Sequence, residues 1–349
     1  FIGKSGKQRR GGTAGRIRMG YEMKITVYEV RPDEKGYLCQ AAEQYGVELK
    51  LVRGTMTQEN ISEADGADGI AILGETKLGA NLVEEVARRG IRVVATRTIG
   101  YDHIDLNAAK SNGVHICNGY YDPDGVAEYT VMLMLMALRN YKQALFRANA
   151  NDYSLGGLMG KELRNLTVGI VGTGKIGQKV AQKLNGFGCE LLAYSRRQNA
   201  DTSTGIRYCT LEELYAKSDI ISLHVPLSNQ TRYMIDRAAI GQMKDGVILI
   251  NCARGELMCV EDIIWGIETM KIGALGLDVI EDEEGIYHRD RRSDIIKNRN
   301  MAYIRQFPNV TMTQHMAFYT KEAVKSMAES GIVNIVRCLE GVENPNMIC

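Results

Sequence analysis

The sequence predicts an α/β protein built from two doubly wound parallel sheets. Short β-rich runs alternate with helical stretches along almost the whole chain, which is typical of parallel βαβ units. The β-rich runs are almost continuously apolar, as expected of parallel strands that are covered on both faces. The chain has 349 residues, which is enough for two domains of roughly 100–200 residues each.

The first series of elements begins at Met23. Its pattern predicts strands at residues 24–30, 47–52, 68–73, 92–97 and 114–117. Helices are expected at residues 33–45, 80–89 and 105–111, with Gly90 ending the second of them. We expect a domain boundary near residues 121–123, because Pro123 and Gly125 interrupt the pattern there.

The second series opens with a single long helix, expected from Pro123 to about Arg147. Strands follow at residues 167–171, 190–195, 219–225, 247–251 and 274–279, and helices at 175–187 and 211–217. Thr210 can cap the last helix, with Glu213 completing a capping box.

The composition excludes several classes of protein. The 43 Lys and Arg residues balance 42 Asp and Glu residues, and 45% of the chain is hydrophobic. Neither a strongly basic nucleic-acid binder nor a disordered protein is therefore expected. The eight cysteines form no CxxC pair, which argues against a zinc site or other metal and indicates free thiols in a reducing cytoplasm.

Two segments stand apart from the rest of the chain. Residues 1–22 hold six Lys or Arg and one Glu, and we interpret them as a disordered, non-native leader outside the fold. The alternative is an arm that binds nucleic acid or phosphate. The longest apolar run, residues 131–138, is about a third of a membrane span. It predicts a buried helix or a subunit contact, with no membrane partner.

The strongest local signal is a glycine-rich loop between a predicted strand and a predicted helix, formed by Gly172, Thr173, Gly174, Lys175, Ile176 and Gly177. In this setting GxGxxG is the fingerprint of a dinucleotide-binding Rossmann domain. The first glycine permits the tight turn, the second lets the backbone approach the pyrophosphate, and the third lets the helix pack on the strand. The helix N-terminus then offers amide groups and a positive dipole to the phosphates.

The end of the next strand bears on which nicotinamide cofactor is preferred. NAD sites usually place Asp or Glu there to bind the ribose hydroxyls, whereas this chain has Ser195, Arg196 and Arg197. A missing carboxylate removes repulsion against a 2′-phosphate, and the arginines can bind that group. We therefore expect NADPH to be preferred over NADH. The alternative is that both arginines are solvated and NAD binds through its diphosphate.

Three later segments place polar residues at strand ends, the edge at which α/β sheets bind ligands. Residues 251–255, 277–283 and 313–319 offer Arg254, a carboxylate and His315. This set suits reduction of a 2-keto acid, because an Arg binds the substrate carboxylate and polarises the ketone while a His donates a proton to the developing alkoxide. A carboxylate beside the His fixes the ring and favours its protonated form.

On these motifs the sequence resembles the D-isomer-specific 2-hydroxyacid dehydrogenase family, and most of all its D-lactate dehydrogenase branch, which includes the vancomycin-resistance type. The resemblance runs from Met23 to near the C-terminus. It implies a flavodoxin-like substrate domain at residues 23–121 and 318–349, a Rossmann cofactor domain at residues 122–317, and an active site in the cleft between them. It also implies a homodimer built partly on the helix at residues 126–138.

The resemblance assigns catalytic roles to three residues. Arg254 would bind the substrate and polarise its carbonyl, and His315 would be the acid/base. Glu283, five residues after Asp278, would pair with His315, whereas Glu281 and Glu284 are weaker candidates.

It also implies which residues contact the ligands. Backbone amides near Ile99 and Gly100 would hold the substrate carboxylate, and Tyr121 and Phe318 would lie beside the substrate. Asp278 would face the nicotinamide region. The other implied cofactor contacts are His224, Val225, Pro226, Cys252 and Ala253.

Two positions depart from the family pattern. Gln314 stands where the family usually has Pro, which leaves the backbone before the catalytic His less restricted. Met316 replaces the usual Thr or Ser and adds apolar volume. The substrate side chain is therefore left open, with Phe318 and the loop at residues 74–77 expected to decide it.

The remaining histidines carry weaker signals. His103 lies in the substrate-binding loop and is a weak candidate for a substrate contact, while His115 and His288 are expected to be surface or structural. His288 belongs to residues 285–307, an insertion of the kind found in the lactate branch.

The leading interpretation is an NAD(P)-dependent oxidoreductase that reduces a 2-keto acid, pyruvate first, to the D-2-hydroxyacid. The alternative within enzymes is a reductase for bulkier keto acids such as 2-ketoisocaproate or phenylpyruvate. An alternative from another class is a non-catalytic NAD(H)-sensing module of the co-repressor type, against which the presence of Arg254, Glu283 and His315 argues.

Overall fold

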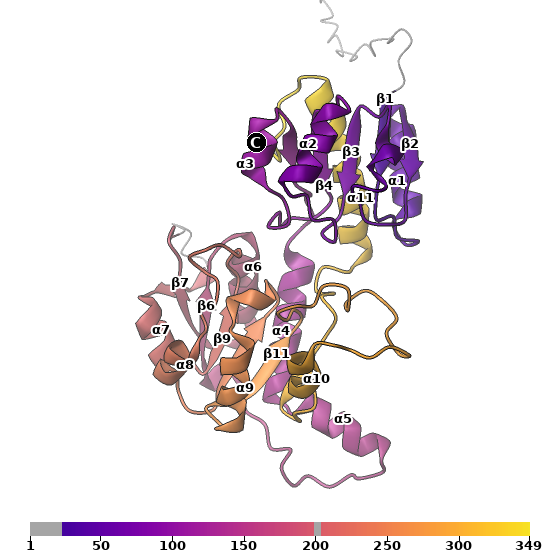
Figure 1. Cartoon of the computed structure of the whole chain (residues 1–349). Coiled ribbons are helices and arrows are strands. Elements are labelled where there is room, and N and C mark those ends of the chain that lie inside the picture. Colours follow the sequence, from indigo (N-terminus) through magenta and orange to yellow (C-terminus); the bar gives the residue numbers. More distant parts are fainter. Residues whose placement is uncertain (1–22, 199–203) are drawn as a thin grey trace, which may run out of the picture.

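The computed structural model describes residues 23–198 and 204–349. The expected leader, residues 1–22, lies outside the described residues. Figure 1 shows two lobes, each built on its own sheet. We call the part formed by β1–β5, α1–α3 and α11 the first lobe, and the part formed by α4–α10 and β6–β12 the second lobe.

The first lobe holds a five-stranded parallel sheet in the order β2-β1-β3-β4-β5. This is the flavodoxin-like order. Its strands are β1 (Met23–Val27), β2 (Val47–Leu51), β3 (Gly69–Ile72), β4 (Val93–Thr96) and β5 (His115–Cys117). Its helices are α1 (Lys35–Tyr45), α2 (Ala80–Arg88), α3 (Leu106–Ser111) and α11 (Lys321–Leu339).

The second lobe holds a seven-stranded parallel sheet in the order β12-β11-β10-β9-β6-β7-β8. Read from β8, this is the Rossmann order with one added strand, and it reverses direction between β6 and β9. Its strands are β6 (Thr167–Val171), β7 (Glu190–Tyr194), β8 (Arg207–Tyr208), β9 (Ile220–Leu223), β10 (Val247–Asn251), β11 (Ile272–Leu277) and β12 (Val310–Met312). Its helices are α4 (Asp124–Leu138), α5 (Tyr141–Asn149), α6 (Lys175–Leu184), α7 (Leu211–Lys217), α8 (Arg237–Gln242), α9 (Val260–Glu268) and α10 (Arg299–Ile304).

Both sheets are covered on both faces, which confirms the predicted doubly wound class. In the first lobe, Ile70 and Val94 pack with side chains of α2 and α3, whereas Ala71 and Ala95 pack with side chains of α1 and α11. Successive residues of a strand point to opposite faces, so every residue of β3 and β4 is buried. This explains why the predicted strands are apolar without alternation.

The single helix predicted from Pro123 to about Arg147 is wrong. Helix α4 ends at Leu138, and Asn140 adopts a left-handed backbone (φ 48°) before α5 begins. Asn tolerates this conformation better than most residues, and the Asn140 side-chain amide donates to the Met159 carbonyl at 3.2 Å. Helix α5 therefore projects from the second lobe (Figure 1), and none of its residues is buried.

The apolar run at residues 131–138 is partly buried in the second lobe, with Met132 exposed. Helix α4 packs against α6, β10 and β11, and Val131, Leu133, Met134 and Leu138 are buried. Across the described residues, no helix combines the length and the apolar character that crossing a membrane requires.

The predicted cap of α7 is confirmed in part. The Thr210 hydroxyl accepts a hydrogen bond from the Glu213 backbone N–H at 3.2 Å. The Glu213 carboxylate instead accepts from Lys217 and Arg207. The two short strands at the sheet edges, β8 and β12, have no clear signal in the sequence.

Candidate active site

The candidate site forms where three neighbouring strands of the second lobe end. Strands β10, β11 and β12 lie side by side, so the loops that follow them meet at one edge of the sheet. Arg254 follows β10, Asp278 and Glu283 follow β11, and His315 follows β12. Residues that are more than 60 positions apart in the chain are thereby brought together.

His315 is held at both its backbone and its ring. Its backbone is left-handed (φ 53°), a conformation that costs of the order of 1 kcal/mol in a residue with a side chain. Its N–H donates to the Asp278 carbonyl at 2.7 Å. Its Nδ1 lies 2.5 Å from Oε1 of Glu283, so Nδ1–H donates to the carboxylate and Nε2 is left for a substrate.

The structure distinguishes Glu283 from its acidic neighbours. Its second oxygen, Oε2, accepts from the Ile280 N–H at 2.9 Å, which fixes the carboxylate beside His315. Glu281 accepts a hydrogen bond from the Tyr233 hydroxyl, and Glu284 forms an ion pair with Lys77 at 3.3 Å. The two weaker candidates are therefore engaged elsewhere.

Asp278 is fully buried and serves the loop that carries His315. Its carboxylate accepts from the Thr313 hydroxyl at 2.6 Å and from the backbone N–H groups of Met316 and Ala317 at 2.9 and 2.7 Å. Burial raises the pKa of Asp278, and these hydrogen bonds oppose that rise. The predicted contact between Asp278 and the nicotinamide stays a prediction, and in this structure both carboxylate oxygens accept hydrogen bonds from the loop that carries His315.

Arg254 reaches from the second lobe to the first. Its Nε donates to Oδ1 of Asp102 at 3.0 Å, and its Nη1 donates to the Ala253 carbonyl at 2.7 Å. A Cβ added at Gly100 would lie 1.7 Å from Nη2 of Arg254, so a larger residue there would displace the guanidinium. Burial would raise the pKa of Asp102, but the charge of Arg254 and hydrogen bonding lower it below its ordinary value.

The loop before Asp102 presents backbone amides to the same place. The Ile99 carbonyl accepts from the Asn118 side chain at 2.9 Å, and the Gly100 carbonyl accepts from the Thr98 hydroxyl at 2.7 Å. Within the part of the chain that the structure describes, neither the Ile99 nor the Gly100 N–H donates to a protein acceptor. These donors are consistent with the predicted contact with a substrate carboxylate.

The aromatic ring of Phe318 lies beside His315. The Phe318 ring centroid lies 6.3 Å from that of His315 and 6.5 Å from that of Tyr121. The guanidinium carbon of Arg31 lies 5.8 Å from the Phe318 centroid. Burial raises the pKa of Tyr121 to about 12, so its hydroxyl is neutral at physiological pH.

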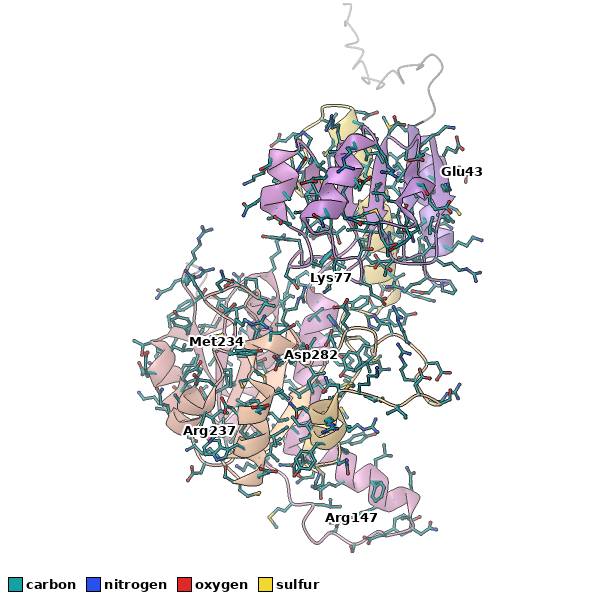
Figure 2. The ribbon with its side chains drawn as sticks, viewed as in Figure 1. Glu43, Lys77, Arg147, Met234, Arg237 and Asp282 are labelled. Carbon is teal, nitrogen blue, oxygen red and sulfur yellow. The ribbon has the colours of Figure 1, made fainter. Side chains whose placement is uncertain are left out.

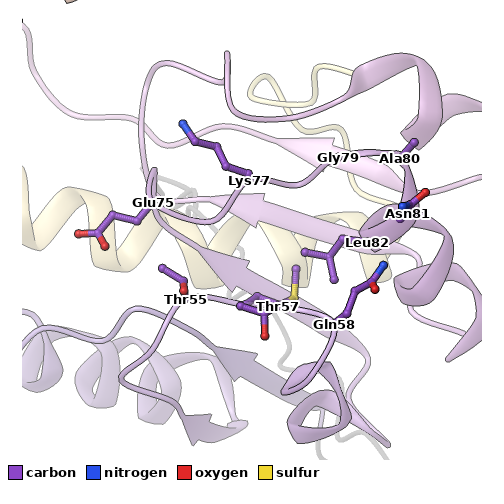
Figure 3. A pocket seen from close by; sticks show the side chains of 10 residues that line it. Thr55, Thr57, Gln58, Glu75, Lys77, Gly79, Ala80, Asn81 and Leu82 are labelled. Carbon is purple, nitrogen blue, oxygen red and sulfur yellow. The ribbon is translucent and has the colours of Figure 1, made fainter. Parts of the chain in front are cut away.

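A hollow of about 610 Å³ opens in the first lobe beside the loop at residues 74–77 (Figure 3). None of Arg254, Glu283 and His315 lines it. The hollow is therefore separate from the catalytic groups. Its polar lining includes Thr55, Thr57, Gln58, Glu75, Lys77 and Asn81.

The glycine loop has the shape that a dinucleotide requires. Gly172 has φ 97°, and a Cβ at Gly177 would lie 2.0 Å from the Gly172 carbonyl oxygen. By contrast, nothing lies within 4 Å of a Cβ placed at Gly174, so this backbone is open to a ligand. The loop precedes the N-terminus of α6, where free amides and the helix dipole favour phosphate.

The other residues of the loop contact the protein. The Thr173 hydroxyl accepts from the Tyr208 hydroxyl at 3.0 Å, and the Ile176 side chain packs on the core of the second lobe. The Lys175 ammonium lies 5.2 Å from the Tyr120 ring centroid in the segment that joins the lobes.

At the end of β7, Ser195 is half-buried, and Arg196 and Arg197 are exposed. Arg196 donates to Gln230 at 3.0 Å. No carboxylate follows β7 at this point, in keeping with the sequence.

The stretch after β9 lies against the glycine loop. A Cβ at Gly172 would meet the His224 carbonyl and the Val225 side chain at 2.7–2.8 Å. Burial lowers the pKa of His224 to about 4, and its Nε2 lies 2.9 Å from the Ser222 hydroxyl. The Pro226 carbonyl accepts from Thr231.

After β10, burial raises the pKa of the Cys252 thiol. The Ala253 N–H donates to the Asn251 side chain at 3.0 Å. All eight cysteines are free thiols. In the described ranges, 23–198 and 204–349, no group of three or more His, Cys, Asp or Glu is arranged to hold a metal ion.

Three contributors were missed by sequence reasoning. Asp102 follows the predicted carboxylate loop and could have been proposed as a partner for Arg254. Arg31 comes from the end of β1 and has no motif around it. His288, predicted to be surface or structural, is exposed, but its Nε2 lies 3.0 Å from the His315 carbonyl. His103 is buried and bonded to Thr96 at 3.2 Å, as expected of a structural residue.

A dinucleotide loop at the switch point of one sheet, with an Arg and a His–Glu pair at the same edge of that sheet, defines an oxidoreductase of the two-domain nicotinamide-dependent class. Residues 131–317 match the family described as "D-isomer specific 2-hydroxyacid dehydrogenase, NAD binding domain". The chain belongs to this family, and its relatives support the D-lactate dehydrogenase branch.

The chain is 41% identical to the aromatic 2-oxoacid reductase of Clostridium sporogenes over 315 residues, which cover 90% of this chain and 95% of that protein. It is 33% identical to the D-lactate dehydrogenase of Escherichia coli, with 93% and 99% covered. The solved structure of the pyruvate reductase of Chlamydomonas reinhardtii gives a TM-score of 0.83 at 34% identity, with 93% and 98% covered.

Proposed function

We propose that this protein reduces a 2-keto acid to the D-2-hydroxyacid, with pyruvate as the first substrate and D-lactate as its product. The observation that carries the proposal is the convergence of the Glu283–His315 pair, Arg254 and the free amides of Ile99 and Gly100 at one place. A non-catalytic sensor of the co-repressor type would not need a carboxylate 2.5 Å from that histidine.

The residues divide the chemistry between them. When bound, a reduced nicotinamide supplies the hydride to the keto carbon. The Arg254 guanidinium binds the substrate carboxylate and polarises the ketone oxygen, to which the electron pair of the C=O bond moves. His315 delivers a proton to that oxygen from Nε2, while Glu283 orients the ring and stabilises its charged form. The cofactor would be held by the glycine loop and the N-terminus of α6.

The test is an assay of purified protein with pyruvate and both reduced cofactors, including the chirality of the product. A His315→Gln variant should lower kcat by at least roughly 100-fold, the low end of general acid/base contributions. Turnover near that of the wild type would remove His315 from the acid role, and L-lactate as product would contradict the proposed stereochemistry.

Bulkier keto acids are the second candidate substrates. The aromatic ring of Phe318 beside His315, with the Tyr121 ring next to that of Phe318, favours a flat or apolar substrate side chain. A relative that is 41% identical is named an aromatic 2-oxoacid reductase. The same assay with 2-ketoisocaproate and phenylpyruvate separates the candidates, because the preferred substrate has the higher kcat/KM.

For the cofactor we propose a preference for NADPH over NADH. Its support is the absence of a carboxylate after β7 and the exposed guanidinium groups of Arg196 and Arg197. A Ser195→Asp variant should shift the ratio of kcat/KM values toward NADH. A wild-type protein that already prefers NADH would contradict the proposal.

We also propose a homodimer in a reducing cytoplasm, with domain limits at residues 23–121 plus 318–349 and at 122–317. Its interface would lie partly on the helix at residues 126–138, where Met132 is exposed and Leu135 and Met136 are half-buried, and partly on α5 and the loop after it. Size measurement in solution, with Phe146→Glu as the disrupting variant, tests this. The exposed apolar side chains on this segment are Leu145, Phe146, Tyr153, Leu155 and Met159.

A further inference from the structure

His288 is a titratable side chain near His315 that the proposed mechanism does not use. Its Nε2 lies 3.0 Å from the His315 carbonyl oxygen, so Nε2–H donates and the carbonyl accepts. The ring centroids of His288 and His315 are 6.0 Å apart, and the His288 ring meets Phe318 edge to face at 6.2 Å. A residue expected to be a bystander therefore touches both the acid and the aromatic wall.

The segment that carries His288 is tied to the backbone of Glu283. The backbone N–H groups of Ile286 and Tyr287 both donate to the Glu283 carbonyl, at 3.0 and 3.1 Å. The Arg291 Nε donates to the Gly285 carbonyl at 2.9 Å, which closes the turn from the other side. His288 is thus presented by a closed turn that begins at Glu283.

The same turn is fastened to the first lobe. Arg289 forms an ion pair with Glu75 at 2.7 Å, and Glu284 forms one with Lys77 at 3.3 Å. Figure 2 labels Lys77 on the edge of the first lobe that faces the second, and Asp282 on the second lobe. These pairs flank His288 in the chain. The Arg289–Glu75 pair is the main tie of this turn across the junction, because the Lys77 and Glu284 side chains are 60% and 61% exposed and such a pair contributes little.

Three residues around the site have strained backbones of the same kind. Asp282, His288 and His315 all adopt left-handed conformations, with φ of 58°, 60° and 53°. Each costs of the order of 1 kcal/mol and persists only where surrounding contacts hold it. The His288 hydrogen bond joins two of the three strained residues, so it restrains the backbone from which the His315 ring extends.

We infer that His288 is a positioning residue for the proposed acid, acting through the His315 main-chain carbonyl. This inference rests on the proposed 2-keto acid reduction. His288 donates no proton to the substrate. It limits the positions of the His315 backbone, and so keeps Nε2 of His315 in reach of the ketone oxygen once Glu283 has fixed the ring.

Three variants test the inference. His288→Gln keeps an N–H donor, whereas His288→Phe keeps the ring and loses the donor, and His288→Ala loses both. Loss of one hydrogen bond that positions the acid should lower kcat by about threefold to tenfold in the Phe and Ala variants. The Gln variant should retain most of the wild-type kcat. His115→Gln, at an exposed histidine on β5, is the matched control and should not change kcat.

Two further measurements separate positioning from other roles. In the Phe variant, KM for pyruvate and for the cofactor should stay within about twofold, and the pH profile of kcat should keep its shape. The chain has five histidines, so the imidazole NMR signals can be assigned by substitution. The His315 signal should move in the Phe and Ala variants and stay in place in the Gln and His115→Gln variants.

Two results would overturn the inference, and a third would contradict the proposed function. Rescue by Phe but not by Gln would show that the ring, not the donor, matters, and would overturn the inference. Loss of one limb of the pH profile would make His288 a proton donor and overturn it as well. A wild-type protein that reduces no keto acid would contradict the proposed function. Even then, the shift of the His315 NMR signal in the His288 variants would test whether the two residues are in contact.

Discussion

Replacing Glu283 with Gln isolates the charge that the structure places beside His315. The side chain keeps its size, but the carboxylate that lies 2.5 Å from Nδ1 of His315 becomes a neutral amide. A hydrogen bond between charged groups contributes about 1.5–3 kcal/mol. Because the two side chains are 29% and 24% exposed, we take the lower half of that range. At 1.36 kcal/mol for each factor of ten, kcat should fall by roughly tenfold to fortyfold.

The assay follows oxidation of the reduced cofactor at saturating pyruvate from pH 5.5 to 8.5. KM for pyruvate should change less than kcat, because Arg254 and the amide loop are untouched. Glu284→Gln is the matched control, since Glu284 lies next in the chain and pairs only with Lys77 on the surface. It should change kcat by less than about threefold. A Glu283→Gln protein with the kcat of the wild type, or an equal loss in Glu284→Gln, would refute the assignment.

Three more predictions concern binding, stability and pH. Arg254→Gln should lower kcat/KM for pyruvate by at least roughly 100-fold while KM for the cofactor stays within about twofold; equal losses for both ligands would indicate misfolding. Glu34→Gln breaks a fully buried ion pair with Arg97 (3.0 Å), so urea denaturation should show a free energy of unfolding that is lower by about 3–5 kcal/mol. In the control Glu84→Gln, at an exposed position, the free energy of unfolding should change by less than about 0.5 kcal/mol. Burial lowers the pKa of His103 from 6.5 to about 4. Between these two pH values, the unfolded chain therefore binds a proton at His103 that the folded protein does not bind. The free energy of unfolding consequently falls as the pH falls through this range. In His103→Gln, the decrease in the free energy of unfolding between pH 7 and pH 4.5 should be smaller by roughly 2 kcal/mol. The same pH dependence in this variant and in the wild type would contradict a buried, neutral His103.

The parts of the fold that could be predicted are those whose signal is local. Strands buried on both faces are visible as apolar runs, and the glycine loop is visible because each glycine has a separate steric reason. The break between α4 and α5 could not be predicted in this way. Residues 136–147 contain mostly good helix formers, and the break depends on Asn140 reaching the Met159 carbonyl, 19 residues further on.

For the candidate site too, local features could be predicted from the sequence, whereas contacts between distant segments could not. The spacing implied by the family resemblance identified Glu283 among three nearby carboxylates, and the structure places it beside His315. The spacing could not reveal that Asp278 turns inward, because its partners Met316 and Ala317 belong to a different strand end. Nor could it reveal His288, whose contact depends on the path of an insertion held by an ion pair to the first lobe.

The contact between Arg254 and the first lobe explains why this site needs two domains. The guanidinium extends from the end of β10 but is bonded to Asp102 and lies against Gly100, both of the first lobe. The proton-donating pair, Glu283 and His315, belongs wholly to the second lobe. In the proposed mechanism, the groups that hold the substrate carboxylate and the group that protonates the ketone therefore stand in the right relation only when the two lobes are together. Under this proposal, ion pairs such as Glu75–Arg289 would contribute to catalysis by fixing the relative position of the lobes, without touching the substrate.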